Sequence, residues 1–430
     1  MNLHREMKEM TTSRRSFLKT ALTATACSPL IRLPFTGGVW SSNDRFGPLE
    51  TDPEGLLDLP RAFRRQWISR AGQGMSDGLH APMFPAGIGV LSETDNEIVL
   101  ACNHRVDPGT PSRTGPFGFK DSRLTDEIRA RLYDLGPNGK PSRGGVTIIR
   151  VDRRARVAVE HHLALAGLLS CAYGAVTPWG SWLCAEQSLQ EPTERYARHH
   201  GFAFEVGAGG ASLQDAEPLV ALGRLSRGGL AVHPETGFVY FSDDEPGGHL
   251  YRFVPSSPDA LGSGSIQVLQ LVDDDFKGGR ATWVDLKIGP DHLVRSAAMP
   301  GTQLGRGVGM CWYAGDLYFG LRRASGRSEI WRLADEPPGP QIEPWLIADG
   351  LDEVRPLTGS PWGDLLIAAF DGHNAVVNGV TMSREMYPIA REVLATGIPV
   401  GACFSRDGKT LFFNSIARGH TLMISGPWDN

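Results

Sequence analysis

The feature that most constrains the fold is a three-strand pattern that recurs along the chain. An apolar segment, a tight turn and two further apolar segments follow one another in residues 228–255, 307–335 and 401–427. The turns Pro-Glu-Thr-Gly (234–237) and Arg-Asp-Gly-Lys (406–409) carry Gly where a hairpin connection needs a positive φ. Repeated antiparallel units of this kind are typical of a β-propeller.

Second strands of successive units can be placed along most of the chain, beginning near Glu97, Ser181, Phe238, Asp316, Asp364 and Thr410. We therefore predict an all-β fold, a β-propeller of about six blades with a few short helical insertions. A β-sandwich is the alternative, but it rarely repeats a three-strand unit so often. The clearest helical segment is 121–136, with Ser122 or Thr125 as its N-cap and Gly136 as its stop.

The first residues have the pattern of an export signal. Residues 12–20, Thr-Ser-Arg-Arg-Ser-Phe-Leu-Lys-Thr, place paired arginines before an apolar stretch that runs to residue 35. This pattern predicts a twin-arginine signal peptide over residues 1–36, and hence a periplasmic or secreted protein. A basic amphipathic helix is the alternative, and lipidation at Cys27 is left open. Residues 37–60 are predicted to be a lead-in segment, and 61–430 a single propeller domain.

Composition excludes several classes of partner. The net charge of −5 and the scattered basic residues argue against nucleic acid. The apolar stretch near the N-terminus is too short to span a bilayer, so no transmembrane segment is predicted. We expect a monomer that binds a small anionic substrate or ligand. Five cysteines follow the signal and none has C-x-x-C spacing, so we interpret most of them as buried thiols rather than a disulfide framework.

Several short segments are similar, in order and spacing, to motifs of one known family, the PhoX alkaline phosphatases. They are LACNHRVD (100–107), CAYGAVTPWGSWLCAEQ (171–187), ALGRLSRGGLAVHPETGFVYFSDD (221–244), GRGVGMCWYAGDLYF (305–319) and PVGACFSRDGKTLFFN (399–414). The resemblance covers nearly the whole chain after the signal. It implies an exported, metal-dependent phosphomonoesterase in which carboxylates and one cysteine thiolate hold iron and calcium ions.

The resemblance also implies which residues form the site. The positions that keep the chemistry of the family's metal ligands are Cys171, Glu186, Asp243 and Asp371, and Asp244 is a conservative change beside them. The arginines at 224 and 306 are kept as the catalytic candidates. Hard Ca²⁺ and ferric iron both prefer anionic oxygen ligands, so this set could hold a reduced metal site.

Other positions depart from the family. Arg105 stands where the family has a glutamate after Asn-His, and Arg227 and Gly228 stand where it has His-Glu. Val308 and Ile398 replace two further carboxylates. Because two of the replacements are themselves cations, they would repel a cluster of multivalent ions. We therefore predict that the full cluster does not assemble.

Two interpretations of the altered site stay open. Arg105, Arg224, Arg227 and Arg306 could line a cationic pocket that binds an anion without metal, because guanidinium groups suit phosphate and carboxylate. Alternatively, these side chains lie at the rim, solvated or salt-bridged, and the pocket has no ligand. The adjacent histidines at 161–162 and 199–200 are interpreted as structural, because neighbours on a strand face opposite sides.

Three functions follow from these alternatives. The first is a phosphoester hydrolase with an eroded metal site and altered or weak activity, holding iron or calcium at reduced stoichiometry or no metal at all. The second is a non-catalytic, periplasmic, anion-binding propeller. The third is an enzyme that acts on a non-phosphate substrate.

Overall fold

The computed structural model describes residues 45–210, 212–272, 278–294, 299–348, 350–393 and 397–428. All of them lie in one compact unit, residues 37–430. The predicted signal peptide and Cys27 lie outside the described residues. Among the residues that are described, no helix is long and apolar enough to cross a membrane.

The described chain is built almost entirely of antiparallel strands. One four-stranded sheet has the order β4 (Pro85–Glu93), β5 (Glu97–His104), β6 (Gly144–Asp152) and β7 (Val157–Leu168). A three-stranded sheet follows, with β8 (Cys171–Val176), β9 (Ser181–Glu186) and β10 (Ala203–Gly207). A second four-stranded sheet joins the two ends of the propeller: β24 (Ala402–Phe404), β25 (Thr410–Ser415) and β26 (His420–Ser425) pair with β3 (Arg64–Arg70).

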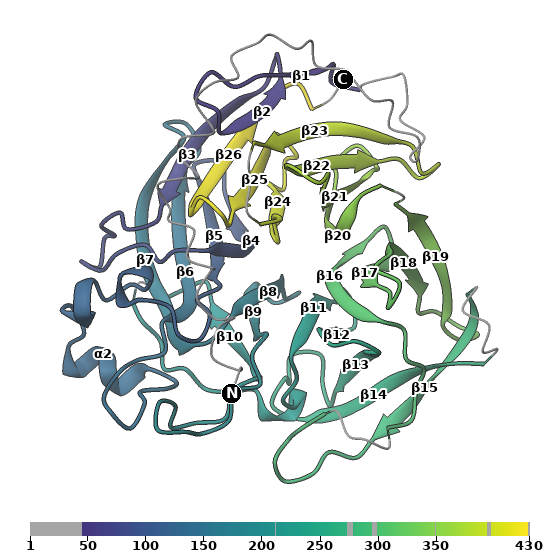
Figure 1. The fold of residues 1–430 in the computed structure, drawn as a ribbon, viewed down its shortest axis with the longest axis horizontal. Helices are drawn as coiled ribbons and strands as arrows, with labels where there is room; N and C mark the ends of the chain where they lie inside the picture. The colour runs from purple at the N-terminus through teal and green to yellow at the C-terminus, as the bar shows by residue number, and fades with distance from the viewer. Residues whose placement is uncertain are drawn as a thin grey trace, which may run out of the picture. The chain divides into compact units, whose positions relative to one another are not determined.

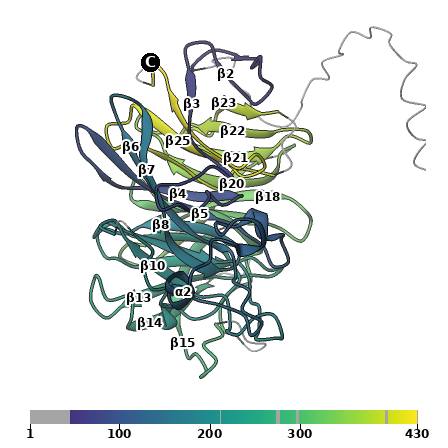
Figure 2. The same ribbon diagram turned by 90° about the vertical axis from the view of Figure 1, so that its left-hand side faces the viewer.

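A six-stranded sheet contains the earliest strands of the described chain. Its order is β1 (Leu49–Glu50), β2 (Leu57–Pro60), β23 (Met386–Glu392), β22 (Ala375–Val380), β21 (Leu365–Phe370) and β20 (Asp352–Gly359). Figure 2 shows the last five of these strands stacked in this order from β2 downwards. The end of the segment predicted as a lead-in thus supplies two strands to a sheet.

The largest sheet has nine strands and joins two antiparallel units. The first unit is β11 (Arg227–Val232), β12 (Val239–Asp243), β13 (Leu250–Pro255), β14 (Gly264–Leu271) and β15 (Gly279–Leu286). The second is β16 (Arg306–Tyr313), β17 (Asp316–Arg322), β18 (Ser328–Ala334) and β19 (Gln341–Ile347). The units are joined because Gly279 and Arg280 of β15 pair with Ile342 and Gln341 of β19.

The predicted β-propeller is confirmed, but its blades are not six separate sheets. The first strand of each antiparallel unit contacts the first strand of the next, in the order β4, β8, β11, β16, β20, β24 and back to β4 (Figure 1). These inner strands surround the centre of the ring. The described strands nevertheless form five hydrogen-bonded sheets, because β15 fuses two units into one.

The predicted helix is present but shorter than expected. It is α2 (Asp126–Arg131), and Thr125 is its N-cap, accepting a hydrogen bond from the Ile128 amide at 3.3 Å. It ends before Gly136 because the amides of Tyr133 and Asp134 bond instead to carbonyl groups at the end of β7. Within the described ranges, the other helical elements are single 3₁₀ turns, η1 (Ser112–Thr114), η2 (Phe119–Asp121) and η3 (Val220–Leu222).

Large buried side chains pack between neighbouring sheets and fix their spacing. Trp182 on β9 is 1% exposed and donates from Nε1 to the Asn103 side chain on β5 at 2.7 Å. A Cβ atom on Gly174 would lie 2.3 Å from the Trp182 ring, so only glycine fits at that position. Trp182 therefore packs against Gly174 within its own sheet and links this sheet to β5 through Asn103.

Candidate functional site

The residues singled out from the sequence lie at one end of the inner strands. Cys171, Arg227 and Arg306 begin β8, β11 and β16, and Glu186 and Asp243 end β9 and β12. In an antiparallel pair, the start of one strand and the end of its partner share an edge of the sheet. The register accordingly places Cys171 opposite Glu186 and Arg227 opposite Asp243. We call this end of the ring the mouth.

The Glu186 carboxylate is buried and its oxygens are fully engaged. Oε1 accepts hydrogen bonds from the Leu169 amide at 2.8 Å and from Nδ1 of His200 at 2.7 Å. Oε2 accepts from the amides of Gly201 at 2.7 Å and Phe202 at 3.3 Å. Four donors occupy the lone pairs that a metal ion would need.

His200 links Glu186 to a second buried carboxylate that sequence reasoning did not find. Its Nε2 lies 3.3 Å from Oδ2 of Asp134. Burial lowers the pKa of His200, but the two carboxylates outweigh burial and raise the pKa to about 9. The ring is therefore a cation that donates to both acids. Asp134 was missed because the pattern of residues 121–136 predicted a helix there.

Cys171 is buried with a second thiol beside it. Burial, the neighbouring Cys184 thiol and the negative charge of Glu186 all raise the pKa of Cys171 well above its usual value. Without a bound cation, the side chain is therefore a neutral thiol.

The two aspartates predicted as metal ligands have separate partners. Oδ2 of Asp243 accepts from the His249 amide at 2.9 Å and from the Tyr251 hydroxyl at 2.8 Å. Its Oδ1 is buried without a partner among the described residues. Oδ1 of Asp371 accepts from the amides of His373 and Asn374, so this side chain caps the turn between β21 and β22.

These contacts do not fit the iron and calcium cluster that the resemblance implies. Glu186 has no free lone pair, and Asp371 is engaged in its own turn. Across the described ranges, no three His, Cys, Asp or Glu side chains are grouped so that they could hold a metal ion. Of the predicted metal ligands, all of which lie among the described residues, Asp243 alone offers an unpartnered buried oxygen.

The four arginines divide into two buried and two partly exposed side chains. Arg227 is 0% exposed and donates to the carbonyls of Gly201, Leu222 and Gly223 at 2.6, 2.8 and 2.8 Å. Burial lowers its pKa to about 10. Arg224 donates to the His200 carbonyl at 3.0 Å and to Glu191 at 2.6 Å. Both guanidinium groups thus hold the protein's own chain together.

Arg306 and Arg105 lie at the surface of the mouth. The Arg306 side chain is 44% exposed and makes a two-point contact with Asp244, at 2.6 and 3.2 Å. Arg105 is 37% exposed and donates from Nε to Asp107 at 3.3 Å. The structure therefore does not bring all four arginines into one cationic pocket.

Sequence reasoning missed a tyrosine on which the charges of the mouth act. Burial raises the pKa of Tyr173, and the charges of Arg355, Asp244, Arg105 and Glu353 all act on its hydroxyl. That hydroxyl has no hydrogen-bond partner among the described residues. We call this set the mouth cluster: Arg105, Tyr173, Asp244, Arg306, Glu353 and Arg355.

The sequence held one signal for this cluster. Tyr173 stands in Cys-Ala-Tyr-Gly, where the PhoX motif has Cys-Ala-Gly-Gly, so a large hydroxyl side chain replaces a glycine at the mouth. Glu353 and Arg355 gave no comparable signal. Glu353 contacts Arg355 at 3.0 Å and Arg322 at 3.3 Å, and its φ of 52° is a left-handed value that sequence alone does not predict.

The other half of the channel is lined mainly by residues with apolar side chains. A cavity of about 390 Å³ is bordered by the inner strands, with Met310, Trp312 and Phe404, by Trp182 of β9 and by Arg406. Its residues lie toward the ends of the inner strands, whereas the mouth cluster lies at their starts. The polar groups are thus concentrated at one end of the ring.

The fold defines this chain as a β-propeller protein. Residues 154–330 match the family model of alkaline phosphatase PhoX, which supports the assignment drawn from the motifs. No curated protein sequence matches the chain.

Solved structures with a similar arrangement are remote in sequence. A putative gluconolactonase is 11% identical with a TM-score of 0.45, covering 88% of this chain and 97% of that one. The WD40 β-propeller domain of Doa1 is 9% identical with a TM-score of 0.43, covering 85% and 97%. The gluconolactonase XC5397 from Xanthomonas campestris is 15% identical with a TM-score of 0.38, covering 71% and 94%. Similarities this low carry no argument about activity.

Proposed function

We propose that this PhoX-like propeller protein binds a small anionic ligand at the mouth cluster, without an iron and calcium cluster. The observation that carries the proposal is the saturation of Glu186, whose two oxygens accept four hydrogen bonds from the protein itself. A metal ion at this carboxylate would have to displace the charged His200 ring and buried amides, which is costly.

The chemistry of the mouth cluster favours an anion. Arg105, Arg306 and Arg355 each contact one carboxylate and keep further N–H donors. Arg105 and Arg306 are partly exposed, and exposed arginine–carboxylate pairs are worth little, so a phosphate or carboxylate ligand can exchange with these two pairs at low cost. Planar guanidinium groups bind such ligands through two parallel hydrogen bonds. The Tyr173 hydroxyl supplies a neutral donor beside them.

Elemental analysis and ligand binding test this proposal together. Purified full-length protein should contain no stoichiometric iron or calcium, and should bind inorganic phosphate or a small carboxylate in calorimetric titration. Arg306→Gln should weaken binding about tenfold, because a charge-assisted contact is lost. The exposed Arg154, in the β6–β7 turn, offers a matched control as Arg154→Gln. Stoichiometric iron plus calcium, or a metal-free protein that binds no anion, would contradict the proposal.

A hydrolase with a reduced metal site is the competing function. The observation that favours it is the buried Oδ1 of Asp243, which has no partner among the described residues. If one cation binds there, added Ca²⁺ should raise the melting temperature and support turnover of a generic phosphomonoester. Asp243→Asn should then abolish both effects.

Export is proposed on the sequence alone. The paired Arg14 and Arg15 lie outside the described residues, and the proposal rests on the twin-arginine pattern of residues 12–20. Replacing both arginines by lysine should retain the protein inside the cell, which cell fractionation measures. An unchanged distribution would contradict export by this route.

A further inference from the structure

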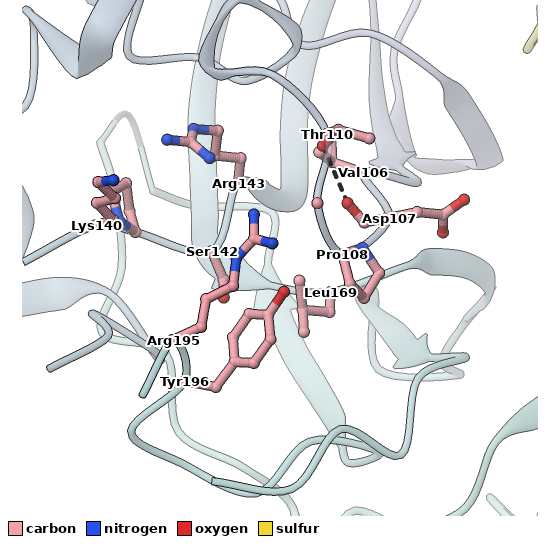
Figure 3. Close-up of a pocket in the computed structure, with 12 residues that line it drawn as sticks. Val106, Asp107, Pro108, Thr110, Lys140, Ser142, Arg143, Leu169, Arg195 and Tyr196 are labelled. Carbon is pink, nitrogen blue, oxygen red and sulfur yellow. Dashed lines mark hydrogen bonds between the residues drawn. The ribbon is translucent and has the colours of Figure 1, made fainter. Parts of the chain in front are cut away.

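A small polar pocket lies beside the mouth and is not used by the proposed function. It is formed by the loop after β5, the segment 140–143 and the pair Arg195 and Tyr196 (Figure 3). We propose that this pocket binds a small oxyanion such as inorganic phosphate, independently of the mouth cluster. The name loop pocket is used below for its lining residues, 106–110, 140–143, 169 and 195–196.

Positive charge at the loop pocket is not neutralised by the protein. Neither the Lys140 nor the Arg195 side chain has a carboxylate partner among the described residues. Arg143 is held by a two-point contact to Asp121, at 2.9 and 2.6 Å, so it is fixed in place. Two cationic side chains thus remain available to an anion.

A buried tyrosine directs a neutral donor into the same pocket. Tyr196 is 7% exposed, and its hydroxyl has no partner among the described residues. Figure 3 shows the hydroxyl next to the Arg195 guanidinium, whose centre lies 5.6 Å from the tyrosine ring. Burial raises the pKa of Tyr196 against the opposing charges of Arg195 and Arg143, so the hydroxyl keeps its proton. An oxyanion would accept a hydrogen bond from it.

Asp107, the acidic residue in the lining of the loop pocket, points away from Arg195 and Tyr196. Asp107 accepts from the Ser170 hydroxyl at 2.7 Å and from Arg105 at 3.3 Å, both outside the loop pocket. Figure 3 shows its carboxylate directed away from Arg195 and Tyr196. This orientation removes the main source of repulsion for an anion.

The Arg195 guanidinium lies against the backbone of the loop after β5. Its Nη1 lies 3.6 Å, an ordinary van der Waals distance, from the point where a Cβ atom on Gly109 would be placed. In the same loop, the Thr110 hydroxyl donates to the Asp107 carbonyl at 3.0 Å. Arg195 therefore borders the pocket on the side of this loop.

The size of the loop pocket selects a small ligand. Its cavity volume is about 40 Å³. This is room for roughly three water molecules, because each needs about 10–15 Å³ on this measure. A tetrahedral oxyanion fits in place of such waters, whereas a nucleotide does not.

Calorimetric titration of full-length protein with inorganic phosphate tests the proposal. The control for lost surface charge is Arg154→Gln, in an exposed turn outside the loop pocket. Wild type and Arg154→Gln should bind alike, Arg195→Gln should bind about tenfold more weakly, and Tyr196→Phe about fivefold more weakly. Tyr196→Phe keeps the aromatic ring and removes only the hydroxyl, so weaker phosphate binding by this variant would report the loss of a hydrogen bond rather than misfolding. Circular dichroism of the variant checks that it is folded.

The two anion sites give separable results. If both proposals hold, Arg306→Gln and Arg195→Gln each remove one of two sites. If the mouth cluster binds nothing, phosphate binding should survive in Arg306→Gln and be weakened only by Arg195→Gln and Tyr196→Phe. No phosphate binding by wild type, or binding that is lost only in Arg306→Gln, would overturn the loop-pocket proposal.

Discussion

Nδ1 of His200 donates a 2.7 Å hydrogen bond to Oε1 of Glu186 where both side chains are 0% exposed. With Asp134 on the other ring nitrogen, one buried cation lies between two buried anions. Glu186, which the family resemblance implies to be a metal ligand, is therefore part of an internal ion network. A protonated imidazole there supplies positive charge from within the chain.

Glu186→Gln should strongly destabilise the protein. The substitution removes the charge that faces His200 and turns an accepting oxygen into an amide donor opposite buried amides. Breaking one partner of a buried ion pair costs about 3–5 kcal/mol. Urea denaturation followed by fluorescence measures the change.

The matched control for that substitution is Asp371→Asn, in a partly exposed turn. This substitution should lower the free energy of unfolding by about 1 kcal/mol, because it weakens only a local capping contact. Equal effects of the two substitutions would contradict the internal role of Glu186. A loss of bound metal in Glu186→Gln, without loss of stability, would do so as well.

Arg227→Met should destabilise the fold far more than Arg306→Met. Arg227 satisfies three buried carbonyl groups, and unsatisfied buried polar groups cost about 1–3 kcal/mol each. Arg306 is 44% exposed and pairs with Asp244 at the surface, where such pairs contribute less than about 1 kcal/mol. Thermal unfolding of the two variants makes the comparison, and a larger loss for Arg306→Met would show that Arg227 is not structural.

Acidification should lower the folding stability, because it favours protonation of histidines that are buried in the neutral form. Burial lowers the pKa of His104 to about 4, despite its hydrogen bond to the Met83 carbonyl. Because the pKa is lowered on folding, this contribution to stability is present above about pH 6.5 and is lost as the pH falls through 4. Folding stability measured between pH 7 and pH 4 should fall less steeply in His104→Gln than in wild type, and parallel curves would contradict this role.

Gly174→Ala should displace Trp182, which links its own sheet to β5. The new methyl group would lie 2.3 Å from the Trp182 ring, which is fixed by its bond to Asn103. Overpacking of this kind costs about 1–3 kcal/mol. Gly209→Ala is the control, since no atom lies within 4 Å of its added methyl group. Similar melting temperatures for the two variants would show that the Trp182 ring yields easily.

Part of the fold was accessible from the sequence because its signals are local. The repeated strand pattern and its hairpin turns predicted the propeller, and Thr125, one of the two candidate caps, is the N-cap of the helix. The helix end was predicted too late because Tyr133 and Asp134 bond to the distant residues Ala166 and Gly167, which no local pattern reveals. The fusion of two blades through β15 and β19 is another long-range pairing of this kind.

The candidate site could be located from the sequence but not interpreted. The motifs identified Cys171, Glu186 and Arg306, which the antiparallel register brings to the same end of the ring. Tyr173 could have been found as a departure from the family motif. The partners of each group could not, because Asp134 and His200 reach Glu186 from separate segments of chain.

The sequence alone determined the all-β propeller and the residue types at its mouth, because periodicity, turn residues and motif order are properties of short segments. Tertiary structure decided what those residues do. Burial and hydrogen bonding commit Glu186, Arg224 and Arg227 to the protein's own groups, and leave Arg105 and Arg306 exposed. The physical reason is that the availability of a charged side chain depends on which donors and acceptors reach it in three dimensions.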